Sequence, residues 1–180
     1  AEAIILLDVQ SKPKYAELNG QPGMLSNTNA TTNDTVRFTC NAEAEPEPSV
    51  EWFINGDPIG GYLPERMSFQ NNRHTLVITE VCKTCHGLGR VSDLMVIQCN
   101  TSNHHGYLYS SGYLNVLEGT SLIAGPVDTE VISGDGTVFT CSARSDPSTP
   151  VEYEWLLNGQ NLMYEPGRVE QDDEGSLHII

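Results

Sequence analysis

The sequence lacks long apolar runs, and no stretch approaches the ~20 consecutive apolar residues that a membrane-spanning helix needs. The opening run AIILLDV is too short for the centre of a signal peptide, has no basic flank and follows no initiator Met. We therefore expect the 180 residues to be a mature segment of a longer protein, and AIILLDV to form a strand.

Basic residues are also scarce, with 9 Lys and Arg against 24 Asp and Glu and a formal net charge of −15. Binding of nucleic-acid phosphates or anionic lipid needs a basic surface, so this balance excludes both classes of function. The denser acidic patches, EAEPEPSVE and VEQDDE, are interpreted as solvated surface.

Helical periodicity is nearly absent, and short β-rich runs alternate with Gly, Pro, Asn and Asp clusters, which is typical of a sandwich or barrel. The chain also repeats itself: TVRFTCNAE returns as TVFTCSAR, VEWFING as YEWLLNG, and HTLVI as GSLHI. Cys40 and Cys141 are 101 residues apart, and Trp52 and Trp155 are 103 apart. The common offset predicts two similar domains in tandem.

The order of cysteine and tryptophan identifies the type of domain. In the first repeat Cys40 precedes Trp52, and Cys99 follows, which is the Cys–Trp–Cys order of an immunoglobulin sandwich. A Cys40–Cys99 disulfide would join the two sheets against Trp52 and stabilise the fold by ~4 kcal/mol through loop closure. Trp155 is predicted to be the core tryptophan of the second repeat, and Cys141 to pair with a cysteine beyond residue 180.

We therefore predict an all-β fold of tandem immunoglobulin-like β-sandwiches of the I-set type. Residues 12–118 form the first sandwich, and residues 119–180 form a second one that lacks strands F and G at its C-terminal end. Residues 1–11 are predicted to be the last strand of a preceding immunoglobulin domain, with an extended strand A as the alternative.

The stretch VCKTCHGLGR, residues 81–90, lies at the predicted E–F corner. The tyrosine that usually precedes the second cysteine by two positions is replaced by Ile97, although Asp93 occupies the place of the usual acid. We expect an altered corner that contains this insertion.

Cys82, Cys85 and His86 suggest several chemistries. Their spacing matches c-type haem attachment, and a redox pair is a second alternative, but the first needs a helical pocket and the second a helix N-terminus. A zinc clip completed by His104 or His105 would need one ion to span both ends of strand F, ~20 Å apart. We predict a local Cys82–Cys85 disulfide with no metal and no cofactor, and keep zinc or redox chemistry as the alternative.

Three sequons, at Asn29, Asn33 and Asn100, indicate N-glycosylation in an oxidising, secreted environment. Asn29 is predicted to lie in a loop, whereas Asn33 on strand B and Asn100 on strand F are predicted to point outward. Glycans there would leave edges, loop tips and junctions for contact. His74 and His178 are interpreted as surface residues of strand E in the two repeats.

The stretch QCNTSNHHGYLYSSGYLNVL, residues 98–117, resembles the F–G hairpin of the fourth immunoglobulin domain in the neurofascin, NrCAM and neuroglian family. PEPSVEWFINGDPI, residues 46–59, resembles the B–C–C′ region of the same domain, and the second repeat resembles the fifth domain more loosely. The corner insertion and its paired cysteines depart from the family pattern, which suggests a divergent, invertebrate member.

The resemblance implies an extracellular segment of a single-pass type I neuronal adhesion receptor and no enzyme. Such receptors mediate homophilic and heterophilic cell–cell recognition in axon and dendrite patterning. The implied partners are cell-surface or extracellular proteins, including a second copy. An immunoglobulin-type co-receptor in a multiprotein guidance complex, without homophilic adhesion, is the alternative.

Overall fold

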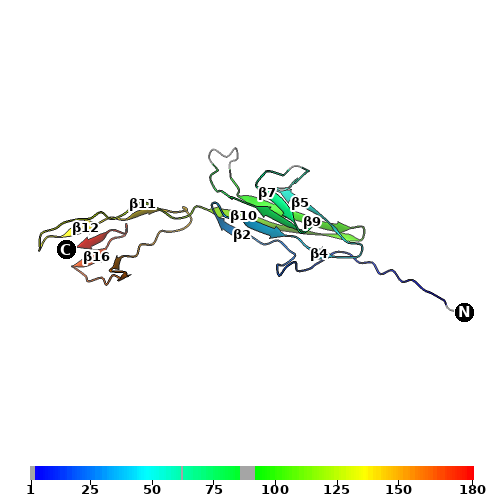
Figure 1. Cartoon of the computed structure of the whole chain (residues 1–180), viewed down its shortest axis with the longest axis horizontal. Coiled ribbons are helices and arrows are strands. Elements are labelled where there is room, and N and C mark those ends of the chain that lie inside the picture. The colour runs from blue at the N-terminus through cyan, green and yellow to red at the C-terminus, as the bar shows by residue number, and fades with distance from the viewer. Residues whose placement is uncertain (1–2, 62, 86–91) are drawn as a thin grey trace. The chain divides into compact units, whose positions relative to one another are not determined.

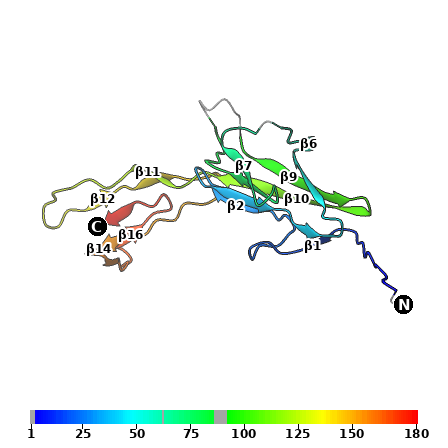
Figure 2. The same cartoon turned by 45° about the vertical axis from the view of Figure 1, so that its right-hand side comes forward.

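The computed structural model describes residues 3–61, 63–85 and 92–180, and the chain divides into two compact units. Unit 1 is Ala1–Leu117 and unit 2 is Glu118–Ile180. The described elements are β-strands joined by turns and loops (Figures 1 and 2), which confirms the predicted all-β class. Within the described residues, no helix is long and apolar enough to cross a membrane.

Unit 1 is a sandwich of two main sheets and one short strand pair. The larger sheet has the order β2-β10-β9-β5-β6, the smaller has the order β3-β8-β7, and β1 pairs with β4. The strands are β1 (Lys14–Tyr15), β2 (Thr28–Thr31), β3 (Val36–Thr39), β4 (Ala42–Glu43), β5 (Ser49–Ile54), β6 (Asp57–Pro58), β7 (Met67–Gln70), β8 (Thr75–Ile78), β9 (Met95–Asn103) and β10 (Gly106–Leu117).

The pairing directions give the immunoglobulin topology. β2 runs parallel to β10, with Thr28 opposite Leu114, whereas β9 is antiparallel to both β10 and β5. The sheets therefore correspond to strands A′-G-F-C-C′ and B-E-D of an immunoglobulin sandwich. Asn55 and Gly56 both adopt positive φ between β5 and β6, which is the conformation that a tight hairpin turn requires.

The core lies between the two sheets. Side chains at alternate positions of β3 and β9 point into it, because successive residues of a strand face opposite sides. Trp52 is only 1% exposed, and its indole Nε1 donates a hydrogen bond to the Arg73 carbonyl at 2.6 Å. The structure joins Cys40 to Cys99 across this core, with an S–S distance of 2.06 Å.

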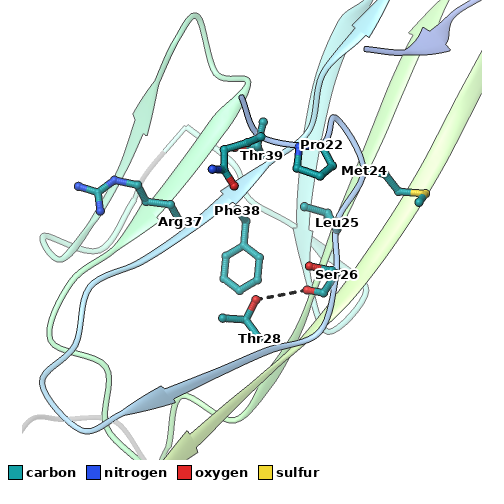
Figure 3. Close-up of a pocket in the computed structure, with 9 residues that line it drawn as sticks. Pro22, Met24, Leu25, Ser26, Thr28, Arg37, Phe38 and Thr39 are labelled. Carbon is teal, nitrogen blue, oxygen red and sulfur yellow. Dashed lines mark hydrogen bonds between the residues drawn. The ribbon is translucent and has the colours of Figure 1, made fainter. Parts of the chain in front are cut away.

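Between β1 and β2 the chain crosses from the short β1-β4 pair to the larger sheet. Figure 3 shows this crossing segment beside β3, where Leu25 and Phe38 line a small pocket of about 230 Å³. The Leu25 backbone N–H donates to Ser110 Oγ of β10 at 2.9 Å, which fixes the segment to the larger sheet. Both apolar side chains are buried, so the crossing closes this edge of the core.

Unit 2 repeats part of this arrangement. Its strands are β11 (Ser121–Ala124), β12 (Thr137–Phe139), β13 (Ser142–Arg144), β14 (Leu156–Leu157), β15 (Gln160–Asn161), β16 (Val169–Gln171) and β17 (Leu177–Ile179). The order β12-β17-β16 matches the smaller sheet of unit 1, and the hairpin β14-β15 matches β5-β6. Unit 2 thus has the sheet order B-E-D and the C–C′ hairpin of an immunoglobulin sandwich.

The N-terminal segment forms no strand among residues 3–13, and β1 begins at Lys14. Residues 1–11 were expected to form a strand, either the last one of a preceding domain or an extended strand A, and the described part of this segment forms neither. The segment leaves the end of unit 1 in an extended course (Figure 1), and its side chains at residues 3–12 are exposed. Ser11 holds its base, since the Ser11 N–H donates to the Glu45 carbonyl at 2.7 Å. An isolated apolar segment without a sheet neighbour has no backbone partners to form a strand.

Candidate functional site

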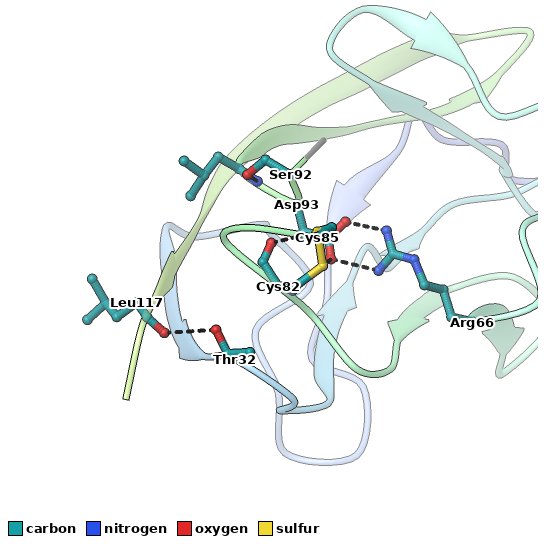
Figure 4. The surroundings of a disulfide bond; sticks show 8 residues. Thr32, Arg66, Cys82, Cys85, Ser92, Asp93 and Leu117 are labelled. Carbon is teal, nitrogen blue, oxygen red and sulfur yellow. Dashed lines mark hydrogen bonds and ion pairs between the residues drawn. A yellow bond between two sulfur atoms is a disulfide. The ribbon is translucent and has the colours of Figure 1, made fainter. Parts of the chain in front are cut away.

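The E–F corner contains the residues that the sequence offers for chemistry. Cys82 and Cys85 form a disulfide in the structure, and both are buried. Figure 4 shows the disulfide packed beside Asp93, whose carboxylate forms an ion pair with the Arg66 guanidinium. The Asp93 side chain is fully buried and that of Arg66 is 13% exposed. The corner therefore contains one local disulfide and one ion pair between segments distant in sequence.

Backbone hydrogen bonds complete this closure. The Cys82 N–H donates to Asp93 Oδ2 at 2.9 Å, and the Asp93 N–H donates to the Cys82 carbonyl, also at 2.9 Å. In most immunoglobulin domains a tyrosine hydroxyl makes the corner hydrogen bond. Ile97 occupies that position here and is fully buried, so it supplies packing without a hydrogen bond. The Cys82–Asp93 pair supplies the polar link that a tyrosine would otherwise make.

The same residues include side chains that can bind a metal ion or undergo redox chemistry. Potential ligand atoms of Cys82, Cys85 and Asp93 lie within 4.8 Å of one another among the described residues. Both sulfur atoms are bonded to each other, however, and the carboxylate already faces a guanidinium. Thiolates are the form that binds zinc, so the oxidised pair does not fit the ion. His86 lies outside the described residues.

The two histidines of the F–G turn lie far from this corner. β9 runs from Met95, beside the corner, to Asn103, beside His104 and His105. A nine-residue strand of this kind is about 30 Å long at ~3.3 Å per residue. The structure thus keeps the corner and the turn at opposite ends of unit 1 (Figure 1), and one ion cannot contact both.

The sequons occupy places that differ in part from the predicted ones. Asn29 lies on β2 and not in a loop, since its backbone pairs with Asn115 of β10. Asn33 lies in the turn between β2 and β3, with φ of 76°, and not on the strand itself. Both side chains are exposed, whereas Asn100 on β9 is half-buried and its Oδ1 is enclosed without a hydrogen-bond partner.

The solvent face of the larger sheet carries a row of tyrosines. Tyr107, Tyr109 and Tyr113 lie at alternate positions of β10 and are 74%, 53% and 41% exposed. Tyr109 is opposite Asn100 on β9, which in turn is opposite Glu51 on β5. Tyrosine is enriched at protein–protein contacts because it offers a rigid apolar ring with a polar tip. This row was missed by the sequence analysis, although the period-two spacing of YLYSSGY signals it.

The core residues of unit 2 are less buried than their counterparts in unit 1. Phe139, Cys141 and Trp155 are half-buried, whereas their counterparts Phe38, Cys40 and Trp52 in unit 1 are buried. Phe139 and Trp155 line a groove of about 680 Å³ whose lining is mostly apolar. The Trp155 ring contacts Phe139 of β12, and its Nε1 donates to the Gly175 carbonyl at 2.9 Å, but the residue remains half-buried, so its core role stays a prediction. Cys141 has a free thiol.

The remaining histidines make local contacts. His74, which directly precedes β8, lies with Nδ1 3.1 Å from the Cys40 carbonyl. His178 on β17 lies with Nε2 2.9 Å from Asp172 Oδ2. The hydrogen bond from His178 is the main reason that the pKa of Asp172 is held below its usual value, and the backbone N–H of Ser176 adds to the effect.

Comparisons with known proteins identify the domain family of the chain and solved structures with a similar fold. Residues 22–88 match the immunoglobulin I-set domain, and the topology of unit 1 defines the same class. A solved structure of Drosophila OTK, extracellular domains 3–5, superimposes with a TM-score of 0.68 and 20% identity, covering 97% of this chain and 54% of that one. The chain is thus a tandem immunoglobulin segment, as predicted.

Proteins similar in sequence show which immunoglobulin proteins the chain is related to. Neurofascin of Gallus gallus is 30% identical over 145 residues, which are 79% of this chain and 10% of the relative. The neuronal cell adhesion molecule of the same species is 28% identical over 142 residues, 78% of this chain and 10% of the relative. The chain therefore spans about a tenth of the curated relatives it matches. It belongs to the neural immunoglobulin cell-adhesion molecules, and the predicted family is confirmed.

Proposed function

We propose that this chain is part of the ectodomain of a neuronal cell-surface receptor of type I topology that mediates homophilic and heterophilic recognition in axon and dendrite patterning. We assign residues 12–118 to a fourth immunoglobulin domain, residues 119–180 to a fifth, and residues 1–11 to the end of a preceding one. The partner is another extracellular protein surface, including a second copy of the receptor.

The tyrosine row on β10 is the observation that supports recognition. Contact surfaces of proteins are depleted in charge and enriched in tyrosine relative to other surface. The half of the sheet near the F–G turn fits this composition, because Tyr107 and Tyr109 lie beside Ser102 and Asn100 of β9. Glu51 is the neighbour on β5, and it offers a polar contact at the rim of the surface.

The positions of the sequons also favour the half of the sheet near the F–G turn as the contact surface. Asn29 pairs with Asn115, and the Asn33 N–H donates to the Val81 carbonyl, so both asparagines lie at the corner end of unit 1. Glycans at these two positions would leave the end that carries Tyr107 and Tyr109 open. A glycan on Asn100 would instead cover Tyr109, which makes occupancy at that sequon decisive for the proposal.

Bead aggregation tests the proposal directly. The chain is displayed on fluorescent beads as the wild type, as Tyr107→Ser/Tyr109→Ser, and as Tyr164→Ser, which removes a comparably exposed tyrosine from unit 2. We expect wild-type and Tyr164→Ser beads to aggregate and the double variant to remain dispersed. Glycopeptide mass spectrometry of the same protein measures occupancy at Asn100.

The outcomes separate the two functions. Aggregation of the double variant to the wild-type extent, or full occupancy at Asn100 in aggregating protein, would contradict a contact through this row. Dispersed wild-type beads that still bind cultured neurons in a Tyr109-dependent way would instead support the co-receptor without homophilic adhesion.

A further inference from the structure

The two histidines of the F–G turn converge on one oxygen atom. Nε2 of His104 lies 3.2 Å from Oε1 of Gln10, and Nε2 of His105 lies 2.6 Å from the same oxygen. The two imidazole rings are in contact, with centroids 3.9 Å apart. All three side chains are exposed, so the point where they meet is open to solutes.

Oxygen donors stand beside this pair of imidazoles. Gln10 contributes its amide oxygen, and its Nε2 donates to Asp8 Oδ2 at 2.8 Å, which places a carboxylate one amide group away. Imidazole nitrogen together with carboxylate or amide oxygen is a ligand set for zinc-type divalent cations. In the structure each Nε2–H donates to the Gln10 oxygen, so an ion binds the tautomer that carries its proton on Nδ1 and presents the Nε2 lone pair.

The backbone around the histidines is held before any ion arrives. Asn103 Oδ1 accepts the His105 N–H at 2.9 Å, which shapes the turn. Asn103 Nδ2 donates to the carbonyls of Ser11, at 2.8 Å, and Pro46, at 2.9 Å, and so ties the N-terminal segment to the turn. A prearranged set of donors binds more tightly, since less conformational freedom is lost on binding.

The charge of the protein favours a cation at this place. The formal net charge is −15, and the Asp8 carboxylate, which accepts a hydrogen bond from Gln10, adds negative charge beside the group. The cysteine cluster of the corner is a poorer candidate, because its sulfur atoms are joined in the disulfide. Only the turn combines convergent nitrogen atoms with an open approach among the sites described above.

We propose that His104, His105 and Gln10 form a surface site for a zinc-type divalent transition-metal cation, with water completing its coordination. Through Gln10, the bound ion connects the N-terminal segment to the F–G turn in addition to the hydrogen bond between Asn103 and Ser11. This site goes beyond the proposed recognition function, since it requires no partner and does not involve the tyrosine row.

Isothermal titration with Zn²⁺ alone tests the site. The full chain is used with its disulfides intact and with the Cys141 thiol alkylated, because a free thiol would bind zinc on its own. We expect one equivalent of zinc per chain, and a loss of affinity of about tenfold or more in His104→Gln and in His105→Gln. His178→Gln is the matched control, since His178 also lies beside a carboxylate on an exposed surface.

The opposite results overturn the proposal. No binding up to millimolar zinc would do so, as would a one-to-one affinity that neither turn variant changes or that His178→Gln abolishes. Tryptophan fluorescence in a Trp155→Phe background, which reports Trp52 alone, checks that unit 1 of each variant remains folded.

A second measurement does not depend on the turn variants. Hydrogen exchange of residues 3–11 should slow on addition of Zn²⁺ in the wild type and stay unchanged in Gln10→Ala, whose substitution lies in the extended segment outside the sandwich. Equal protection in both proteins, or none in the wild type, would contradict a metal link between this segment and the turn.

Discussion

The Arg66–Asp93 pair gives the sharpest test of how the corner is held. Asp93→Asn keeps an oxygen that can accept the Cys82 N–H but removes the negative charge that the Arg66 guanidinium faces. Arg66→Met makes the complementary change, because it keeps much of the side-chain length and leaves the carboxylate in place. The double variant removes both charges.

The expected magnitude follows from burial. The Asp93 side chain is 0% exposed and that of Arg66 is 13% exposed, so water cannot replace a lost partner. Removing one member of a buried ion pair costs about 3–5 kcal/mol, since the other charge is left desolvated. We expect each single variant to lower the free energy of unfolding of unit 1 by about 3 kcal/mol. The double variant should recover about 1–3 kcal/mol of the summed loss.

Urea unfolding of the full chain measures these free energies. Trp155→Phe serves as the background, so that fluorescence reports only Trp52 in the core of unit 1. The reasoning is refuted if each single variant loses less than about 1 kcal/mol, the value typical of a solvent-exposed salt bridge. Strict additivity in the double variant would equally show that the two charges do not interact.

Three further predictions concern other parts of the chain. Cys82→Ser/Cys85→Ser should lower the free energy of unfolding of unit 1 by about 2 kcal/mol in urea, because the loop that the disulfide closes is short. A loss above about 4 kcal/mol would contradict this loop-closure explanation. His178→Leu should raise the pKa of Asp172 toward its usual value, because it removes the hydrogen bond that lowers this pKa. In a carboxyl NMR titration Asp172 should then take up its proton at higher pH, and an unchanged titration would contradict His178 as the main cause. Gly112→Ala should destabilise unit 1 by about 1–3 kcal/mol, because the added methyl group would lie 2.4 Å from the backbone oxygen of Ser26. Wild-type stability in thermal unfolding would show that the segment around Ser26 moves to make room.

Much of unit 1 follows from sequence pattern alone. The period of two places Phe38 and Cys40 on the same side of their strand, and the Cys–Trp order then fixes which sheets face each other. The Asn55–Gly56 turn was recognisable for the same reason, since few residues tolerate its backbone conformation. These features depend on local sequence and on one strong spacing, which is why they could be read without coordinates.

The electrostatic part of the corner could not be read in this way. Asp93 was recognisable from its distance to Cys99, but its partner Arg66 lies 27 positions earlier and carries no spacing signal of its own. The positions of Asn29 and Asn33 were misjudged because a parallel strand, β2, has no hairpin turn to mark it in sequence. Contacts between segments distant in sequence remain hidden until the sheets are assembled.

The absence of the corner tyrosine makes the two ends of β9 differ in the interactions that hold them. Ile97 contributes only packing, so the corner depends on the disulfide, which closes a short loop at Cys82–Cys85, and on the ion pair, which links Arg66 to Asp93 just before β9. The F–G turn at the other end of β9 has neither link and is held by hydrogen bonds of Asn103. Hydrogen-bonded surface segments open at lower free energy than a covalently and ionically closed core. The stretch of β9 near the corner can therefore serve as the rigid support of unit 1, whereas the turn end, where Tyr107 and the paired histidines lie, keeps its shape through hydrogen bonds alone.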